Sequence, residues 1–293
     1  MKVLVTGAKG QLASDLVPLL EAAGFTPVPF SSAELDISDR AAVFEAVKRT
    51  GPGLIVNPAA YTKVDLAEKE KERAYAVNAE GAENLAAAAA ACGCPIVHVS
   101  TDFVFDGRSP APYSEEAGTN PLSVYGASKL SGEKAVAAAN EAHVVVRTSW
   151  LYGTNGHNFV KTILRLASER ESLRVVYDQA GTPTWSADLA AMLAGICKAI
   201  ESGQKPWGLY HYSNEGVASW YDFAVAICEE AASLGMELKC GQIEPILTSE
   251  YPVPAARPAY SVLNKAKIKK TFGASIPHWR RSLSTMLKEL KGS

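Results

Sequence analysis

Short apolar runs alternate with helical patterns along the first half of the chain. Strands are predicted where apolar residues predominate, at residues 2–6, 25–30, 54–57, 96–99 and 143–148. Helices are predicted between them, for example after residue 10, where Leu12, Leu16, Leu19 and Leu20 recur at helical spacing. Strands that alternate with helices are typical of a parallel sheet with helices on both faces. The pattern therefore predicts an α/β fold with a doubly wound parallel sheet.

The regular alternation of predicted strands and helices ends after residue 150. A helical pattern at 187–200 is followed, from residue 207 on, by what reads as scattered short elements with many prolines. We therefore expect two domains. Residues 1–150 with 184–213 would form the sheet domain, and residues 151–183 with 214–293 a smaller domain that closes over the sheet edge.

A glycine turn joins the first predicted strand to the first helix. Gly7 and Gly10 permit a tight turn and a close approach of backbone N–H groups, and Ala13 is small enough for the helix to lie near the strand. Strand, glycine turn and helix together form the element that seats a pyrophosphate on a helix N-terminus. The sequence thus predicts a dinucleotide site at this turn.

A tyrosine and a lysine lie one helical turn apart in the segment 124–130. Tyr125 and Lys129 would share one helix face, and a nearby cation can lower the pKa of a phenol. Such a tyrosine can donate a proton to a carbonyl oxygen. Thr101, at the end of a predicted core strand, would place a hydroxyl in the same crevice. Without the glycine turn and Thr101, Tyr125 and Lys129 would be interpreted as an ordinary surface tyrosine and a solvated lysine.

The sequence contains no clear determinant of the choice between NADPH and NADH. Dinucleotide folds often carry an acid at the end of the second strand for the ribose hydroxyls, but here Phe30 is followed by Ser31 and Ser32. We expect NADPH, with NADH as the alternative. Asp36 could cap a turn or contact an adenine amino group, and both interpretations stay open.

Composition excludes several classes of partner. The 293 residues carry a net charge of −2, so no basic surplus is available to neutralise nucleic-acid phosphates. No apolar run reaches the length of a membrane span, and we expect no membrane partner and a cytoplasmic location. The odd number of cysteines, five, does not describe a disulfide framework, and no His or Cys spacing predicts a metal site.

Motifs spread over nearly the whole chain resemble those of the extended short-chain dehydrogenase/reductases, and among them the dTDP-4-dehydrorhamnose reductases. The segments that carry the resemblance are 7–12, 56–65, 77–78, 100–107, 120–129, 147–150, 156–159, 178–184 and 257–258. The resemblance implies a Rossmann-type sheet domain that binds NAD(P), a smaller sugar-nucleotide domain, and reduction of a 4-keto-6-deoxy sugar carried on dTDP. It leaves a homodimer open.

The resemblance also implies roles for matching residues. The catalytic set would be Thr101, Tyr125 and Lys129. The coenzyme would contact these last two and Gly7, Gly10, Gln11, Leu12, Asp36, Ile37, Ala59, Ala60, Tyr61 and Thr62. The sugar nucleotide would contact Thr101, Asp102, Trp150, Asn158 and Arg257.

Two rival functions are compatible with the same fold. A sugar-nucleotide epimerase or dehydratase would share the fold, but dehydratases usually carry a glutamate base after the Thr-Asp pair, where this chain has Phe103. A non-catalytic subunit of the same fold would not need the Thr–Tyr–Lys set. Ala13 and Pro58 replace a Gly and an Ala common in the family, which would change fit and not chemistry.

Overall fold

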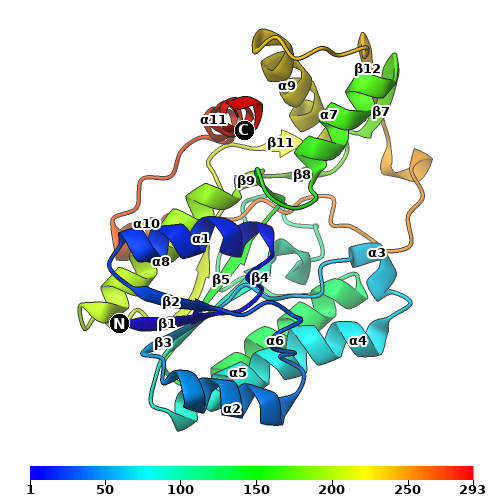
Figure 1. Cartoon of the computed structure of the whole chain (residues 1–293). Helices are drawn as coiled ribbons and strands as arrows, with labels where there is room; N and C mark the ends of the chain where they lie inside the picture. The colour runs from blue at the N-terminus through cyan, green and yellow to red at the C-terminus, as the bar shows by residue number, and fades with distance from the viewer. Residues whose placement is uncertain (293) are drawn as a thin grey trace.

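A six-stranded parallel sheet lies at the centre of the computed structural model, which describes residues 1–292 (Figure 1). Its strand order is β10-β5-β4-β3-β1-β2. The strands are β1 (Lys2–Val5), β2 (Thr26–Pro29), β3 (Leu54–Asn57), β4 (Ile96–Thr101), β5 (His143–Thr148) and β10 (Gly208–His211). Every pairing among them is parallel, which confirms the predicted fold class.

Helices cover both faces of the sheet (Figure 1). One layer contains α1 (Gln11–Ala22), α8 (Ser186–Glu201) and α10 (Ala266–Phe272), and the other contains α2 (Arg40–Thr50), α5 (Gly81–Ala91) and α6 (Val124–Ala139). Successive residues of a strand point to opposite faces. Val3 and Val5 accordingly pack in the first layer's core, and Leu4 packs in the second's. The central strands β1, β3, β4 and β5 are therefore buried on both sides.

The helical stretch between β3 and β4 is interrupted. It consists of α4 (Lys71–Tyr75), a π-helical segment (Ala76–Glu80) and α5. A single π-helical turn inside a helix often lies at a functional site. Here it contains Asn78, which is buried and faces the segment after β3.

A third hydrophobic core lies beyond the sheet and contains the remaining long helices. It is built from α7 (Phe159–Glu169), α9 (Trp220–Ser233), α11 (Trp279–Gly292) and short strands that form two-stranded sheets. These strands include β6 (Leu151–Tyr152), β7 (Ser172–Val176), β8 (Ala180–Gly181), β9 (Thr184–Trp185), β11 (Ala218–Ser219) and β12 (Gln242–Ile246), and a short helix α3 (Val64–Ala67) lies nearer the sheet. The expectation of only short elements after residue 207 is wrong, because α9 and α11 have 14 residues each. The apolar faces of both helices pack in the third core.

The described residues contain no helix that is both long and apolar enough to cross a bilayer.

Two glycines let α6 approach neighbouring backbone closely. A Cβ at Gly126 would overlap with the carbonyl oxygen of Phe103, and a Cβ at Gly132 would overlap with that of Asn78. Both glycines are buried. The helix that carries Tyr125 and Lys129 is therefore fixed at two points, against the segment after β4 and against the π-helical segment.

We expect Gly132→Ala to destabilise the fold by about 1–3 kcal/mol, because the added methyl group overpacks a backbone contact. Gly195→Ala on α8 is the matched control. It makes the same chemical change at an exposed helical site where the nearest atom is 3.9 Å away. The control should stabilise the protein by about 0.5–1 kcal/mol, because alanine restricts the unfolded chain. Urea unfolding measures both changes, and equal effects of the two substitutions would contradict the close approach.

Candidate active site

The sheet reverses its winding between β1 and β3. From β1 the chain passes through α1 to β2 at one edge, then returns through α2 to β3 on the other side of β1. In doubly wound sheets, ligands bind at such a point, outside the carboxyl ends of the strands. The predicted site segments after β1, β3 and β4 all lie at this edge.

The glycine turn after β1 has the geometry of an anion cradle. Gly7 has φ +61°, and a Cβ there would come within 3.1 Å of the Ala59 Cα. Gly10 precedes the first residue of α1, and no side chain caps that helix. The first N–H groups of a helix attract phosphate through hydrogen bonds and the helix dipole. Leu12 is buried beneath the turn in the core.

A loop from the third core holds the side chain of Gln11. Asn158 Nδ2 donates to Gln11 Oε1 over 3.0 Å and to the Gly153 carbonyl over 2.8 Å. Asn158 Oδ1 accepts from the Lys161 N–H and caps α7. Gly156 has φ +69°, and a Cβ there would lie 2.8 Å from Gln11 Cγ. Asn158 therefore lies beside the glycine turn, and its side-chain amide is already hydrogen-bonded to other groups of the protein.

An acid that the sequence pattern did not mark, Glu34, lies in the turn that follows β2. Glu34 Oε2 accepts from both the backbone N–H and the hydroxyl of Ser31, at 2.8 and 2.6 Å. These hydrogen bonds lower the pKa of Glu34. Asp36 Oδ1 accepts from the Ser38 N–H and hydroxyl, which is a turn-capping role. Ile37 is buried, and its side chain lies where a Cβ on Gly81 would stand.

Hydrogen bonds from the side chain of Asn78 fix the segment after β3. The Tyr61 N–H donates to Asn78 Oδ1 over 2.8 Å, and Asn78 Nδ2 donates to the Tyr61 carbonyl and to Ser128 Oγ on α6. Ala59, Ala60 and Thr62 are at least partly exposed along this segment. One buried amide therefore aligns the predicted coenzyme-binding backbone with the helix that carries Tyr125.

Thr101 and Tyr125 meet at the carboxyl end of β4. Thr101 is the last residue of β4, and its hydroxyl donates to Asp102 Oδ1 over 3.0 Å. The same hydroxyl acts on the Tyr125 phenol and lowers the pKa of that group. The Tyr125 ring packs edge-on against Phe103, with ring centroids 5.5 Å apart. The pair predicted from residues 24 positions apart is thus brought together.

The expectation that Lys129 lowers the pKa of Tyr125 is wrong. Burial raises the pKa of Tyr125 to about 12, the Thr101 hydrogen bond opposes the shift, and the charge of Asp102 adds to it. Burial likewise raises the pKa of Asp102 to about 6, against hydrogen bonds from the Ser261 and Thr101 hydroxyls. Tyr125 is therefore protonated at neutral pH, which is the form that a proton donor requires.

Lys129 lies deeper than Tyr125 and faces β4. Its side chain is buried, and its Nζ donates to the Val99 carbonyl over 2.7 Å and lies 3.4 Å from His98 Nε2. Burial lowers the pKa of Lys129 to about 8, and the Glu133 carboxylate opposes that shift. Lys129 thus changes charge close to physiological pH.

Two residues predicted to bind the sugar nucleotide are tied to other parts of the protein. Trp150 has φ +47°, and its ring stacks on Trp220 with centroids 3.5 Å apart and planes 6° from parallel. Arg257 forms a two-pronged ion pair with Asp65, at 2.7 and 3.1 Å, which lowers the pKa of Asp65. Arg257 therefore links the C-terminal segment to α3 beside the active-site edge.

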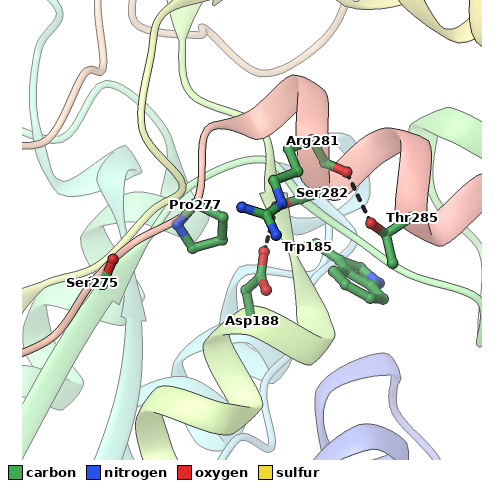
Figure 2. A pocket seen from close by; sticks show the side chains of 7 residues that line it. All are labelled: Trp185, Asp188, Ser275, Pro277, Arg281, Ser282 and Thr285. Carbon is green, nitrogen blue, oxygen red and sulfur yellow. Dashed lines mark hydrogen bonds between the residues drawn. The ribbon is translucent and has the colours of Figure 1, made fainter.

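A surface hollow of about 350 Å³ lies elsewhere, between α8 and α11 (Figure 2). Asp188 there accepts from Ser282 Oγ at 2.5 Å and from Asn214 Nδ2 at 2.7 Å, so its carboxylate joins the two helices. The lining contains none of the predicted site residues.

Comparison with known proteins agrees with this geometry. A family model described as RmlD substrate binding domain matches residues 1–291. A dTDP-4-dehydrorhamnose reductase from Aggregatibacter actinomycetemcomitans is 42% identical over 287 residues, covering 97% of this chain and 98% of its own.

Two solved structures are closely similar. A dTDP-4-dehydrorhamnose reductase from Clostridium acetobutylicum superposes with a TM-score of 0.93 at 40% identity, covering 99% of this chain and 100% of its own. One from Bacillus anthracis, in complex with NADP, has a TM-score of 0.91 at 41% identity, covering 98% and 99%. The chain therefore belongs to the RmlD substrate binding domain family, that of the dTDP-4-dehydrorhamnose reductases.

Proposed function

We propose that this chain reduces the C4 ketone of dTDP-4-dehydro-L-rhamnose to the alcohol of dTDP-L-rhamnose, with NADPH as the reductant and NADH as the alternative. The observation that carries the proposal is a protonated Tyr125 phenol beside Thr101 at the carboxyl end of β4. The relatives named for this reaction, one of them bound to NADP, match this chain over nearly its whole length.

The proton needed for the reduction comes from Tyr125. When bound, the coenzyme would supply the hydride for C4, and negative charge would build on the ketone oxygen. Tyr125 donates its proton to that oxygen as the charge builds, and the Thr101 hydroxyl donates a hydrogen bond to it. The charge of Asp102 helps to keep the phenol protonated. As an ammonium, Lys129 would donate to the ribose hydroxyls.

The residues at the β1 turn fit a dinucleotide. A glycine at position 7 leaves room that a Cβ would fill, and the uncapped first turn of α1 offers its N–H groups. Gly7, Gly10, Gln11 and Leu12 would hold the pyrophosphate, Asp36 and Ile37 the adenine end, and residues 59–62 the nicotinamide ribose. Asp102, Trp150, Asn158 and Arg257 stay our proposed contacts for the sugar nucleotide.

Phe103 argues against the dehydratase rival. The place where a dehydratase carries its glutamate base holds an aromatic ring packed on Tyr125. A hydrocarbon ring cannot remove a proton from a sugar.

The division at residues 150, 184 and 213, the cytoplasmic location and a homodimer remain predictions from the sequence.

We expect Tyr125→Phe to lower kcat by about 10²–10⁴-fold, because the proton donor is lost while the ring keeps its packing. The dissociation constant of NADPH should change little. Oxidation of NADPH, followed by absorbance with dTDP-4-dehydro-L-rhamnose present, measures the rate. Tyr221→Phe removes a half-buried phenol from α9 and should keep full activity. Near-normal turnover by Tyr125→Phe would refute the assignment.

We expect Glu34→Gln to raise kcat/KM for NADPH severalfold and to change the value for NADH less. The carboxylate occupies the N–H and hydroxyl of Ser31 at the end of β2, where the ribose 2′ substituent binds in this kind of fold. Neutralising it removes repulsion of a 2′-phosphate. Glu45→Gln, at an exposed position on α2, makes the same charge change as a control. Equal effects of both substitutions on both coenzymes would contradict a local role for Glu34.

A further inference from the structure

Two cysteine sulfurs lie next to each other at the turn between α5 and β4. Cys92 directly follows the last residue of α5, and Cys94 comes two residues before the start of β4. Their Sγ atoms are 3.3 Å apart. Neither thiol takes part in the reaction proposed above. The pair lies at the amino end of β4, roughly 20 Å along the strand from Thr101 at its carboxyl end.

The turn holds Cys94 by its backbone and leaves Cys92 at the surface. The Cys94 N–H donates to the Ala89 carbonyl over 3.0 Å, and the Cys94 carbonyl accepts from Asn140 Nδ2 over 3.0 Å. The Cys94 side chain packs in the second layer's core, whereas Cys92 is exposed. Gly93 between them has φ +71°, and a Cβ there would meet no atom within 4 Å. A small reagent in solution can therefore reach the turn.

The hydrogen bonds give the two sulfurs different roles. A carbonyl can only accept, so the Cys92 S–H donates to the Ala89 carbonyl at 3.3 Å. The Cys92 sulfur is then the acceptor for the Cys94 S–H. Burial raises the pKa of the Cys94 thiol, and the interaction with Cys92 adds to the shift. Cys94 therefore keeps its proton at neutral pH, and Cys92 is the sulfur that a disulfide in solution meets first.

We propose that Cys92 and Cys94 form a dithiol site that reacts with small disulfides and closes to an internal Cys92–Cys94 disulfide. Consecutive Cα atoms are about 3.8 Å apart, so two cysteines separated by one residue stay within about 7 Å, which is the reach of a disulfide. The two sulfurs need to approach by only about 1 Å to reach the length of an S–S bond.

The reaction balances in two exchange steps, with oxidised glutathione as the oxidant. The Cys92 thiolate attacks one glutathione sulfur, which forms a mixed disulfide and releases the first glutathione. Cys94 then gives up its proton, its sulfur attacks the Cys92 sulfur, and the second glutathione leaves. Two protein thiols are oxidised to one disulfide, and the two protons that they lose end on the two glutathione thiols. Because the thiolate is the nucleophile and burial keeps Cys94 protonated, closure is the slower step.

The other three cysteines are less suited to such a reaction. Cys197 is fully buried on α8, and burial raises the pKa of its thiol to about 12. Cys228 and Cys240 are half-buried in the third core. Burial raises the pKa of the Cys228 thiol to about 11, and the Cys240 S–H donates to the Gln242 carbonyl over 3.2 Å. Cys92 is thus the one exposed thiol among the described residues.

Mass spectrometry of one tryptic peptide tests the proposal. Trypsin cuts after Arg73 and Arg108 and at no site between them, so peptide 74–108 contains Cys92 and Cys94 and no other cysteine. The whole protein is incubated with oxidised glutathione, its remaining thiols are blocked with iodoacetamide, and it is then digested. We expect the peptide first to gain one glutathione and then to lose it, ending two hydrogens lighter and without a blocking group.

Excess dithiothreitol should restore both thiols, because an exposed disulfide is of the labile kind. A parent peptide that never becomes two hydrogens lighter would overturn the proposal. This measurement needs neither substrate nor coenzyme, so its outcome is independent of the proposed function.

Single substitutions assign the role of each sulfur. Cys94→Ala should stop at the mixed disulfide, and Cys92→Ser should lose both products over the same period. Cys240→Ser makes the same change at a half-buried cysteine and should leave closure of the 74–108 peptide unchanged. Reaction of the peptide from Cys92→Ser at the parent rate would overturn the role of Cys92. If Cys94→Ala does not fold, the mass of the parent peptide decides alone.

Discussion

The close approach of α6 to two backbone segments is the constraint on which the active site depends. Gly126 brings the helix against the segment after β4, and Gly132 brings it against the π-helical segment 76–80. Interiors pack as densely as organic crystals, so a helix held at two such points cannot rotate or slide freely. Tyr125 and Lys129 lie on the stretch between and around these contacts, and their positions follow from them.

Burial decides the protonation of the site more than neighbouring charges do. The same desolvation that keeps the Tyr125 phenol neutral favours the neutral form of Lys129, because each loses hydration when charged. The two groups are therefore displaced in opposite directions from their usual pKa values. A reductase needs a proton on the tyrosine when hydride arrives, and this environment keeps it there.

Local spacing made much of this predictable from sequence, and long-range packing did not. The strand, glycine turn and first helix could be predicted because their signals lie within a few residues of one another. The direction of the Tyr125 pKa shift could not, since it depends on burial. Asn57 and His98 form a buried hydrogen bond although they are 41 residues apart, and inside strand patterns they read as ordinary buried polar residues.

Two of the missed features did carry a local signal. Ser219 and Asp222 form a reciprocal capping box at the start of α9, and the Ser-x-x-Asp spacing announces such a box. Glu34 follows Ser31 by three residues, close enough to cap a turn, but only the fold places that turn at the end of β2. Helices α9 and α11 were not predicted, because prolines surround them in the sequence and because their stability comes from tertiary packing.

The pairing of β5 with β10 has a consequence for synthesis on the ribosome. β5 is complete at residue 148, but the strand that covers its open side, β10, begins only at residue 208. In the interval the nascent polypeptide presents a row of unpaired N–H and C=O groups beside an apolar strand, which is a template for pairing with other chains. Until β10 has been translated and has paired, the open side of β5 is therefore a place where another chain could add a strand.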